Sequence, residues 1–131
     1  MTVRKVDDPV PHVADGSIGS VSAFTMIDSL VYVGYAPSNT NAPLSGGTFS
    51  PSLRLKAVTV KSSSNGFVNS YLAAAEVGNV RLASVQTNNA GVSFGVIATQ
   101  SISSVSVNVP RFKWSPTGAN DQALGDFHVI H

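Results

Sequence analysis

The sequence contains no cysteine, so neither a disulfide framework nor a thiolate nucleophile or thiolate metal site can exist. Charged residues are also scarce, at 11% of the chain, against about 25% in an average soluble domain. Serine, threonine, asparagine and glycine take their place. Disorder requires low hydrophobicity together with high net charge, whereas this chain is 43% hydrophobic with a net charge of +1. These values predict one folded domain of 131 residues.

Basic clusters and long apolar runs are missing as well. The longest basic run is Arg4-Lys5, and eight scattered basic residues release few of the counterions on which nucleic-acid binding depends. The apolar run 30–33 is far too short to cross a bilayer, and no apolar segment of a signal peptide follows residues 1–8. Nucleic-acid binding and membrane insertion are therefore not expected. The sparse charge also gives weak protection against self-association.

A short motif recurs along the chain: an aliphatic residue, two small or polar residues, valine, one further residue and a second apolar residue. Its four copies begin at Ile18, Leu55, Val77 and Ile102, so the last three start 22 and 25 residues apart. Turn clusters that end in glycine follow the second and third copies. Short strands and turns repeated at such a period are typical of a solenoid, in which each coil buries its apolar face against the next.

The motif predicts an all-β fold and, within that class, a short parallel β-helix, or β-solenoid. Stacked coils place Val58, Val80 and Val105 above one another as a continuous column, with the serine, threonine and asparagine positions facing solvent. A β-sandwich or jelly roll stays open as the alternative, because such folds also contain many short strands at even spacing. The segment 72–77 is expected to be a strand, since Gly78 and strand-like patterns flank it.

Three segments of the single domain, residues 1–131, depart from the repeat. Residues 1–15 are expected to form an N-terminal arm, and residues 34–52, with their prolines and glycines, a surface insertion loop. Residues 110–131 are expected to form a terminal capping segment that includes a closing strand near Phe127. Such a cap is needed because the last coil of a solenoid must hide its unpaired strand edge.

No catalytic, metal-ligating or cofactor-binding residue is predicted. In a strand, His128 and His131 would point to opposite faces, and both are expected to be exposed near the C-terminus. The aspartates lack the spacing of calcium-binding β-helices. A glycosidase-like pair needs two acids across a cleft, and Glu76, the only glutamate, lies at a coil junction. The serines are expected to face solvent or form turns, so the chain is not expected to be an enzyme.

Four aromatic residues are the candidates for contact with a partner or a glycan. Tyr32 and Tyr35 lie near the insertion, and Phe112 and Trp114 alternate with basic residues. Exposed rings of this kind can stack on sugars or fill a partner's pocket. In the alternative interpretation, Phe112 and Trp114 close the end of the core. The alternation favours this interpretation, because it places both rings on one face of a strand.

The segments 76–98 and 101–109, together with the tail Ala123-Leu124-Gly125-Asp126-Phe127, resemble the terminal coils of large bacterial β-solenoid surface proteins. These proteins are haemagglutinin- or autotransporter-like and occur in bacteria of the planctomycete type. The resemblance covers residues 16–131. It implies a parallel β-helix, an exported parent protein, an extracellular or cell-surface location and a structural or adhesive role, and it carries over no catalytic residue.

We therefore expect a structural or interaction protein. Its expected partner is itself, as a homo-oligomer or filament, or a larger surface scaffold of which it forms part. One alternative is a carbohydrate-binding module that binds a surface glycan through the four aromatic residues. The other alternative is a viral capsid or fibre component, because those proteins also use β-structure rich in serine, threonine and asparagine.

Overall fold

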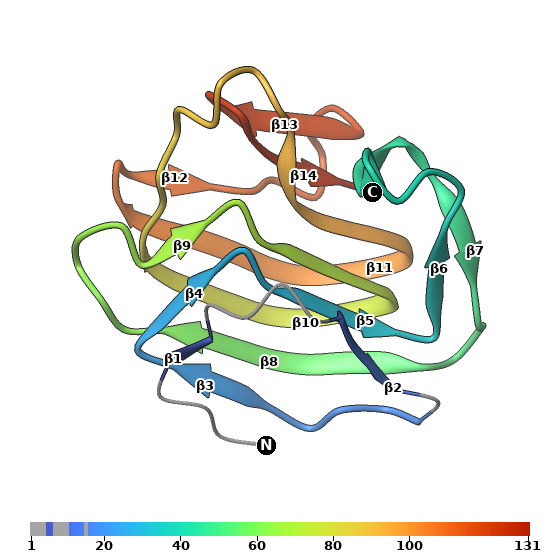
Figure 1. Cartoon of the computed structure of the whole chain (residues 1–131). Helices are drawn as coiled ribbons and strands as arrows, with labels where there is room; N and C mark the ends of the chain where they lie inside the picture. The colour runs from blue at the N-terminus through green and yellow to red at the C-terminus, as the bar shows by residue number, and fades with distance from the viewer. Residues whose placement is uncertain (1–4, 7–10, 15) are drawn as a thin grey trace.

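The computed structural model describes residues 5–6, 11–14 and 16–131, and the expected all-β class is confirmed (Figure 1). The only helical element of these residues is one 3-10 turn, η1 (Pro43–Ser45). The expected N-terminal arm, 1–15, lies outside the described residues except for its two short strands. The strands are β1 (Lys5–Val6), β2 (Pro11–Ala14), β3 (Val21–Ala23), β4 (Thr25–Ile27), β5 (Leu30–Val33), β6 (Tyr35–Pro37), β7 (Gly47–Phe49), β8 (Arg54–Val60), β9 (Phe67–Val68), β10 (Tyr71–Ser84), β11 (Phe94–Val109), β12 (Phe112–Lys113), β13 (Asp121–Leu124) and β14 (Phe127–Ile130).

The strands form three parallel stacks (Figure 1). The first stack contains β2, β5, the first half of β10, the first half of β11, and β14. The second contains β3, β8 and the second halves of β10 and β11. The third contains β1, β4 and β9. Within the described residues, antiparallel pairs occur between β6 and β7 in the insertion and where β12 and β13 join the C-terminal end. The main sheet is therefore mixed.

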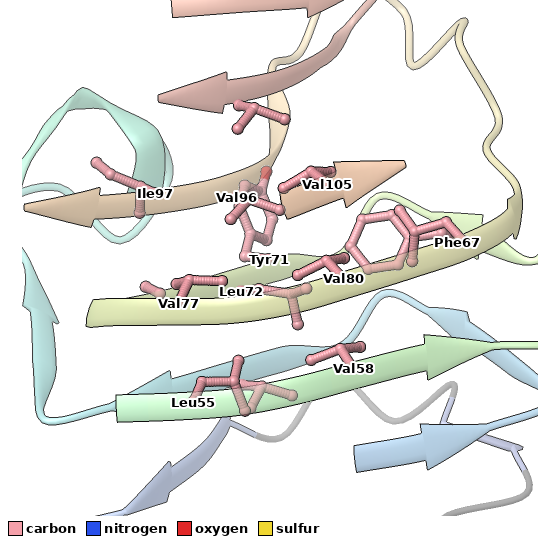
Figure 2. Packing of buried hydrophobic residues seen from close by; sticks show 14 of the residues in the cluster. Leu55, Val58, Phe67, Tyr71, Leu72, Val77, Val80, Val96, Ile97 and Val105 are labelled. Carbon is pink, nitrogen blue, oxygen red and sulfur yellow. The ribbon is translucent and has the colours of Figure 1, made fainter. Parts of the chain in front are cut away.

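The repeated motif occupies equivalent positions in the second stack. Val58 pairs with Val21 of β3 on one side and with Val80 of β10 on the other, and Val80 pairs with Val105 of β11. The side chains of these four valines are at most 1% exposed. Figure 2 shows three of them one above another in the core. The predicted alignment of Val58, Val80 and Val105 is confirmed, and Val21 of the first copy extends the column.

β10 and β11 are long strands that each serve two stacks. A register shift lies between Ala74 and Glu76, where one residue of β10 opposes two of β11. Such a β-bulge bends the strands, and the bend lets one strand continue from the first stack into the second. The expectation of a strand at 72–77 is confirmed. The residue shortly after the bend, Gly78, has to be glycine, because a Cβ atom there would overlap the backbone carbonyl of Lys56 in β8.

The insertion, 34–52, folds onto the stacks through one tyrosine. The hydroxyl of Tyr35 lies within hydrogen-bond distance of the carbonyl oxygens of Pro43, the first residue of η1, and Gly46, the residue after it. Its ring packs against Tyr32 of β5 and Phe49 of β7. Because the ring is buried, it joins the β6–β7 hairpin to the main core and holds η1 close to β11.

The C-terminal end is covered by antiparallel strands. β12 pairs with β11 and β13 pairs with β14, so the first and second stacks each receive a last strand of opposite direction. Phe127 of β14 is fully buried, with its ring centroid 5.9 Å from Phe67, 5.8 Å from Phe94 and 6.0 Å from Phe112. β14 is the strand that the sequence predicts near Phe127, and its aromatic contacts attach the C-terminal segment to the core.

The close approach of β8 and β10 predicts that Gly78→Ala destabilises the protein. The added methyl group must displace the Lys56 backbone, at a cost of about 1–3 kcal/mol. Gly19→Ala is the matched control, because no atom lies near a Cβ atom at that position, and its effect should stay within about 0.5 kcal/mol. Urea unfolding followed by circular dichroism measures both, and equal effects of the two variants would contradict the described spacing of the strands.

Candidate functional site

The four aromatic candidates do not form an exposed patch. Tyr32, Tyr35 and Trp114 are only 5%, 4% and 5% exposed, so these three rings pack in the core, as the alternative interpretation of Trp114 expects, and their contact with a partner or a glycan stays a prediction. Phe112 is half-buried and packs against Phe127. The physical reason is that large rings gain most when they leave water, and each of these rings packs against another ring.

Burial also changes the ionisation of the tyrosines. Loss of solvent raises the pKa of Tyr32 to about 12, with smaller contributions from Tyr35 and Tyr71. Burial likewise raises the pKa of Tyr35 and, together with the charge of Asp28, that of Tyr71. All three phenols therefore keep their protons at neutral pH and pack in the core, and the hydroxyls of Tyr35 and Tyr71 donate hydrogen bonds to backbone carbonyls.

The part of the chain that the structure describes contains no cluster of three histidine, aspartate or glutamate side chains able to hold a metal ion. In the same residues, no helix is long and apolar enough to cross a membrane. Asp121 and Asp126, both near the C-terminus, belong to separate hydrogen-bond networks.

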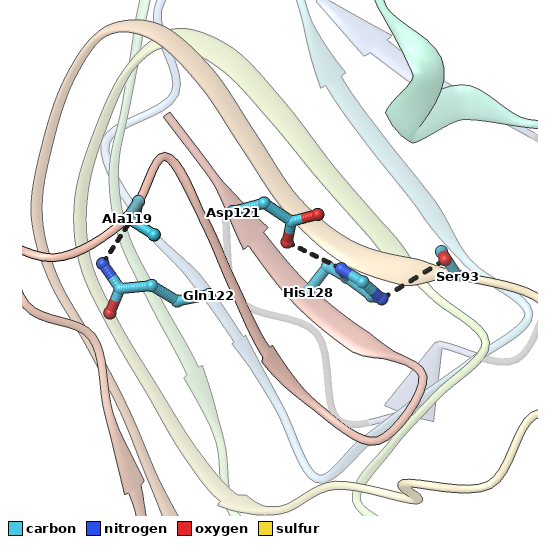
Figure 3. Close-up of polar contacts among 5 residues, drawn as sticks. All are labelled: Ser93, Ala119, Asp121, Gln122 and His128. Atoms are coloured by element: carbon cyan, nitrogen blue, oxygen red, sulfur yellow. Dashed lines mark hydrogen bonds and ion pairs between the residues drawn. The ribbon is translucent and has the colours of Figure 1, made fainter.

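The structure instead brings together a histidine, an aspartate and a serine from distant parts of the chain (Figure 3). Nδ1 of His128 lies 2.7 Å from Oδ1 of Asp121, and Nε2 of the same ring lies 3.3 Å from Oγ of Ser93. The His128 side chain is 21% exposed and the Asp121 side chain 53%. His131 is exposed as expected, whereas His128 is half-buried and two polar groups contact its ring.

Strand pairing places these three side chains on one surface. Asp121 of β13 lies two residues along from Ala123, which pairs with His128 of β14, and residues two apart share a face of a strand. β14 in turn pairs with β11, where Gly95 opposes His128. Gly95 has a φ of 137°, and a Cβ atom there would overlap the His128 carbonyl oxygen. The glycine thus permits β14 to lie beside the residues that follow Ser93.

The turn between β13 and β14 fixes the loop that precedes Ser93. The carboxylate of Asp126 accepts hydrogen bonds from the backbone N–H groups of Asn89 (2.6 Å) and Gly91 (3.0 Å). The Asp126 carbonyl oxygen accepts one from the N–H of Phe94 (3.0 Å). Gly125 has a φ of 63°, a conformation that glycine adopts without strain. The tail motif that the sequence singles out therefore has a structural role in holding the loop.

A pocket of about 380 Å³ opens beside the three residues. One wall is the insertion, with Asn41 and Leu44. The other walls are the loop 91–93, β13 and β14. His131 lies apart, with Nε2 3.3 Å from the carbonyl of Gln100 and its ring against Trp114. The two histidines therefore do not share a site, as the strand periodicity predicts.

Sequence reasoning missed this group, although a local signal was present. Gly91-Val92-Ser93-Phe94-Gly95 has the spacing G-x-S-x-G, and Asp121 and His128 follow in chain order. The expectation that the serines face solvent or form turns also fails for part of them. Four serines are buried polar residues instead: Ser29, Ser62, Ser70 and Ser84.

The chain matches no protein-family model, no curated protein and no solved structure. The resemblance to terminal coils of bacterial β-solenoid surface proteins therefore stays a prediction.

The raised pKa of Tyr32 predicts a loss of stability at alkaline pH. An ordinary tyrosine has a pKa of 10.0, and in the folded protein that of Tyr32 is about 12. Between these values the folded protein binds more protons than the unfolded chain, so the free energy of unfolding falls as the pH rises. Urea unfolding measured across this range should show the fall, and Tyr32→Phe should make it shallower. An unchanged slope in the variant would contradict the assignment.

Proposed function

We propose that the chain is a short parallel β-solenoid that acts as a structural or interaction unit. The order in which the chain visits the three stacks supports this fold. It passes from β2 to β3 and β4, from β5 to β8 and β9, and then along both halves of β10 to Val85, which bridges to Phe67. A β-sandwich consists of antiparallel neighbours with Greek-key connections. Repeated passes in parallel register favour the solenoid.

A ladder of polar side chains at one corner also supports a solenoid. Nδ2 of Asn69 donates to Oδ1 of Asp28 (2.7 Å), and Nδ2 of Asn89 donates to Oδ1 of Asn69 (2.9 Å). Asp28 and Asn69 have φ angles of 50° and 42° and precede the paired strands β5 and β10 by the same distance. Equivalent residues with equivalent backbone geometry in successive layers are expected of stacked coils.

The two ends of this stack differ, and this difference carries the functional proposal. At the C-terminal end, β12 and β13 cover the edges of β11 and β14. At the opposite end, β3 pairs with β8 alone among the described residues, as β13 pairs with β14 alone, but β3 runs parallel to its stack whereas β13 runs antiparallel. A strand with one unpaired edge is a template for a further strand. The proposed role is therefore attachment through the N-terminal edge, either to a second copy or to a larger scaffold.

The antiparallel C-terminal end changes the expected form of self-assembly. Head-to-tail addition that continues a parallel stack requires a parallel edge at both ends, whereas two copies that pair through the same edge form a closed pair. The homo-oligomer that we propose is accordingly a dimer joined through the β3 edges, rather than a filament. The extracellular or cell-surface location implied by the resemblance is proposed with it. The glycan-binding alternative is not favoured, because three of its four aromatic rings are buried. No observation favours a capsid or fibre component.

Ser22 of β3 allows the edge to be blocked without loss of an internal hydrogen bond. The carbonyl of Ala23 accepts a bond from the N–H of Lys61, at the end of β8. Since alternate residues of a parallel strand face the same neighbour, Val21 and Ala23 face β8, and the peptide groups of Ser22 face outward. Proline at this position removes an outward N–H, which edge strands tolerate.

The experiment compares the wild type with Ser22→Pro and Ser22→Ala by analytical ultracentrifugation over a range of concentrations. The wild type should form a dimer, and Ser22→Pro should weaken its association at least about tenfold, or about 1.4 kcal/mol. Ser22→Ala keeps the N–H and should associate as the wild type does. A wild type that stays monomeric at every concentration, or equal association of all three proteins, would count against the proposal. Circular dichroism checks that each variant is folded.

A further inference from the structure

The geometry of Ser93, His128 and Asp121 points to a nucleophilic serine. We propose that the Ser93 hydroxyl attacks small neutral carboxylic esters bound in the adjoining pocket, with His128 as the general base and Asp121 as the positioning residue for its ring. This activity goes beyond the structural role proposed above and does not depend on it, because the residues concerned lie far from the β3 edge. It would overturn the expectation that the chain is not an enzyme.

The hydrogen-bond partners of His128 determine which ring nitrogen carries the proton. An ionised carboxylate can only accept a hydrogen bond, so the contact between Asp121 and Nδ1 places the proton on Nδ1. In the neutral imidazole, Nε2 is then an acceptor, and it faces the Ser93 hydroxyl. A nucleophile, a base and a group that orients the base are the arrangement that activates a serine. The 3.3 Å distance from Ser93 Oγ to Nε2 is typical of such sites before substrate binds.

The backbone around Ser93 is held on both sides, while its side chain stays exposed. Its carbonyl oxygen accepts a hydrogen bond from the Tyr71 hydroxyl (3.1 Å), and the next N–H, that of Phe94, bonds to Asp126. Gly91 has a φ of 80°, so the loop turns sharply just before the serine. Rigid support of an exposed hydroxyl beside its base is what a nucleophile requires.

The lining of the pocket indicates the class of substrate. Its apolar residues are Ala42, Leu44, Val92 and Ile130, and neither lysine nor arginine lines it. The carboxylate of Asp121 disfavours a negatively charged ligand at the same place. A volume of about 380 Å³ is near the lower end of the range for small-molecule sites, about 300–1,000 Å³. A neutral ester with a short acyl chain therefore fits best.

The proposed reaction has two balanced steps. The Ser93 oxygen forms a bond to the carbonyl carbon of the ester while Nε2 of His128 accepts the hydroxyl proton. The bond to the alcohol then breaks, and the alcohol leaves with that proton as an acyl-serine remains. Water attacks the acyl carbon, gives a proton to Nε2, and releases the carboxylic acid as the proton returns to Ser93. Each step needs only the ester and water.

The degree of exposure predicts an order of effects among the three residues. Replacement of Ser93 removes the nucleophile altogether, and replacement of His128 removes a base that typically contributes about 10²–10⁴-fold. Asp121 is more than half exposed, and solvent weakens its interaction with the ring. Asp121→Asn is therefore expected to have a smaller effect, about tenfold.

The same hydrogen bonds could serve only to attach β14 to the loop before β11, and a reactive phosphorus probe distinguishes the two roles. Diisopropyl fluorophosphate forms a bond from phosphorus to an activated serine oxygen and releases fluoride, whereas an ordinary serine reacts very slowly. Intact mass and peptide mapping should show one adduct, on Ser93. Ser93→Ala should give none, His128→Gln should slow labelling at least about 100-fold, and Asp121→Asn about tenfold. Ser103→Ala, an exposed serine of β11, should react as the wild type does.

Turnover of p-nitrophenyl acetate tests the class of substrate with the same variants. Hydrolysis by the wild type should exceed that by Ser93→Ala at least about 100-fold. The edge variant Ser22→Pro should hydrolyse the ester at the wild-type rate. The test of the nucleophile is therefore independent of the test of the dimer. No adduct on Ser93, or equal labelling of wild type and His128→Gln with both proteins folded by circular dichroism, would overturn the proposed nucleophile. Equal hydrolysis by wild type and Ser93→Ala would overturn the ester as substrate.

Discussion

Parallel pairing in register between successive strands is the constraint on which the rest of the structure depends. A parallel ladder places the same position of each repeat above its equivalent, so a valine at that position must pack between valines. The column from Val21 to Val105 follows directly. The same constraint requires a glycine wherever two backbones approach too closely for a Cβ atom, as at Gly78 and Gly95. The packing of the core and the close approaches of the strands therefore follow from the same pairing.

The repeat allowed the second stack to be predicted because its information is local. Six consecutive residues specify which side chains face inward, and the repetition specifies what lies above them. The aromatic residues could not be placed in this way. Alternation shows that Phe112 and Trp114 share a strand face, but it does not show that this face is covered. The segments that cover this face lie far along the chain. Burial of Tyr35 depends on η1, and no periodic pattern in the sequence predicts η1.

The candidate site combines a local signal with a distant one. The spacing from Gly91 to Gly95 could be found in the sequence. The contact of Ser93 with His128 could not, since it joins residues 35 positions apart and requires β14 to pair with β11 rather than with any other strand. The insertion completes the pocket with Asn41 and Leu44. A segment that interrupts the repeat thus supplies one wall, as expected where loops carry function on a regular scaffold.

The turn at Gly125 and Asp126 has a consequence for the order in which the site forms. The carboxylate of Asp126 holds the loop that carries Ser93, and His128, the proposed base, follows two residues later in β14. Both contacts therefore depend on the pairing of β14 with β11. Until that pair has formed, Ser93 is an ordinary hydroxyl with neither partner. The reactivity that we propose for it would accordingly appear only in the completed fold, and not in a folding intermediate that lacks β14.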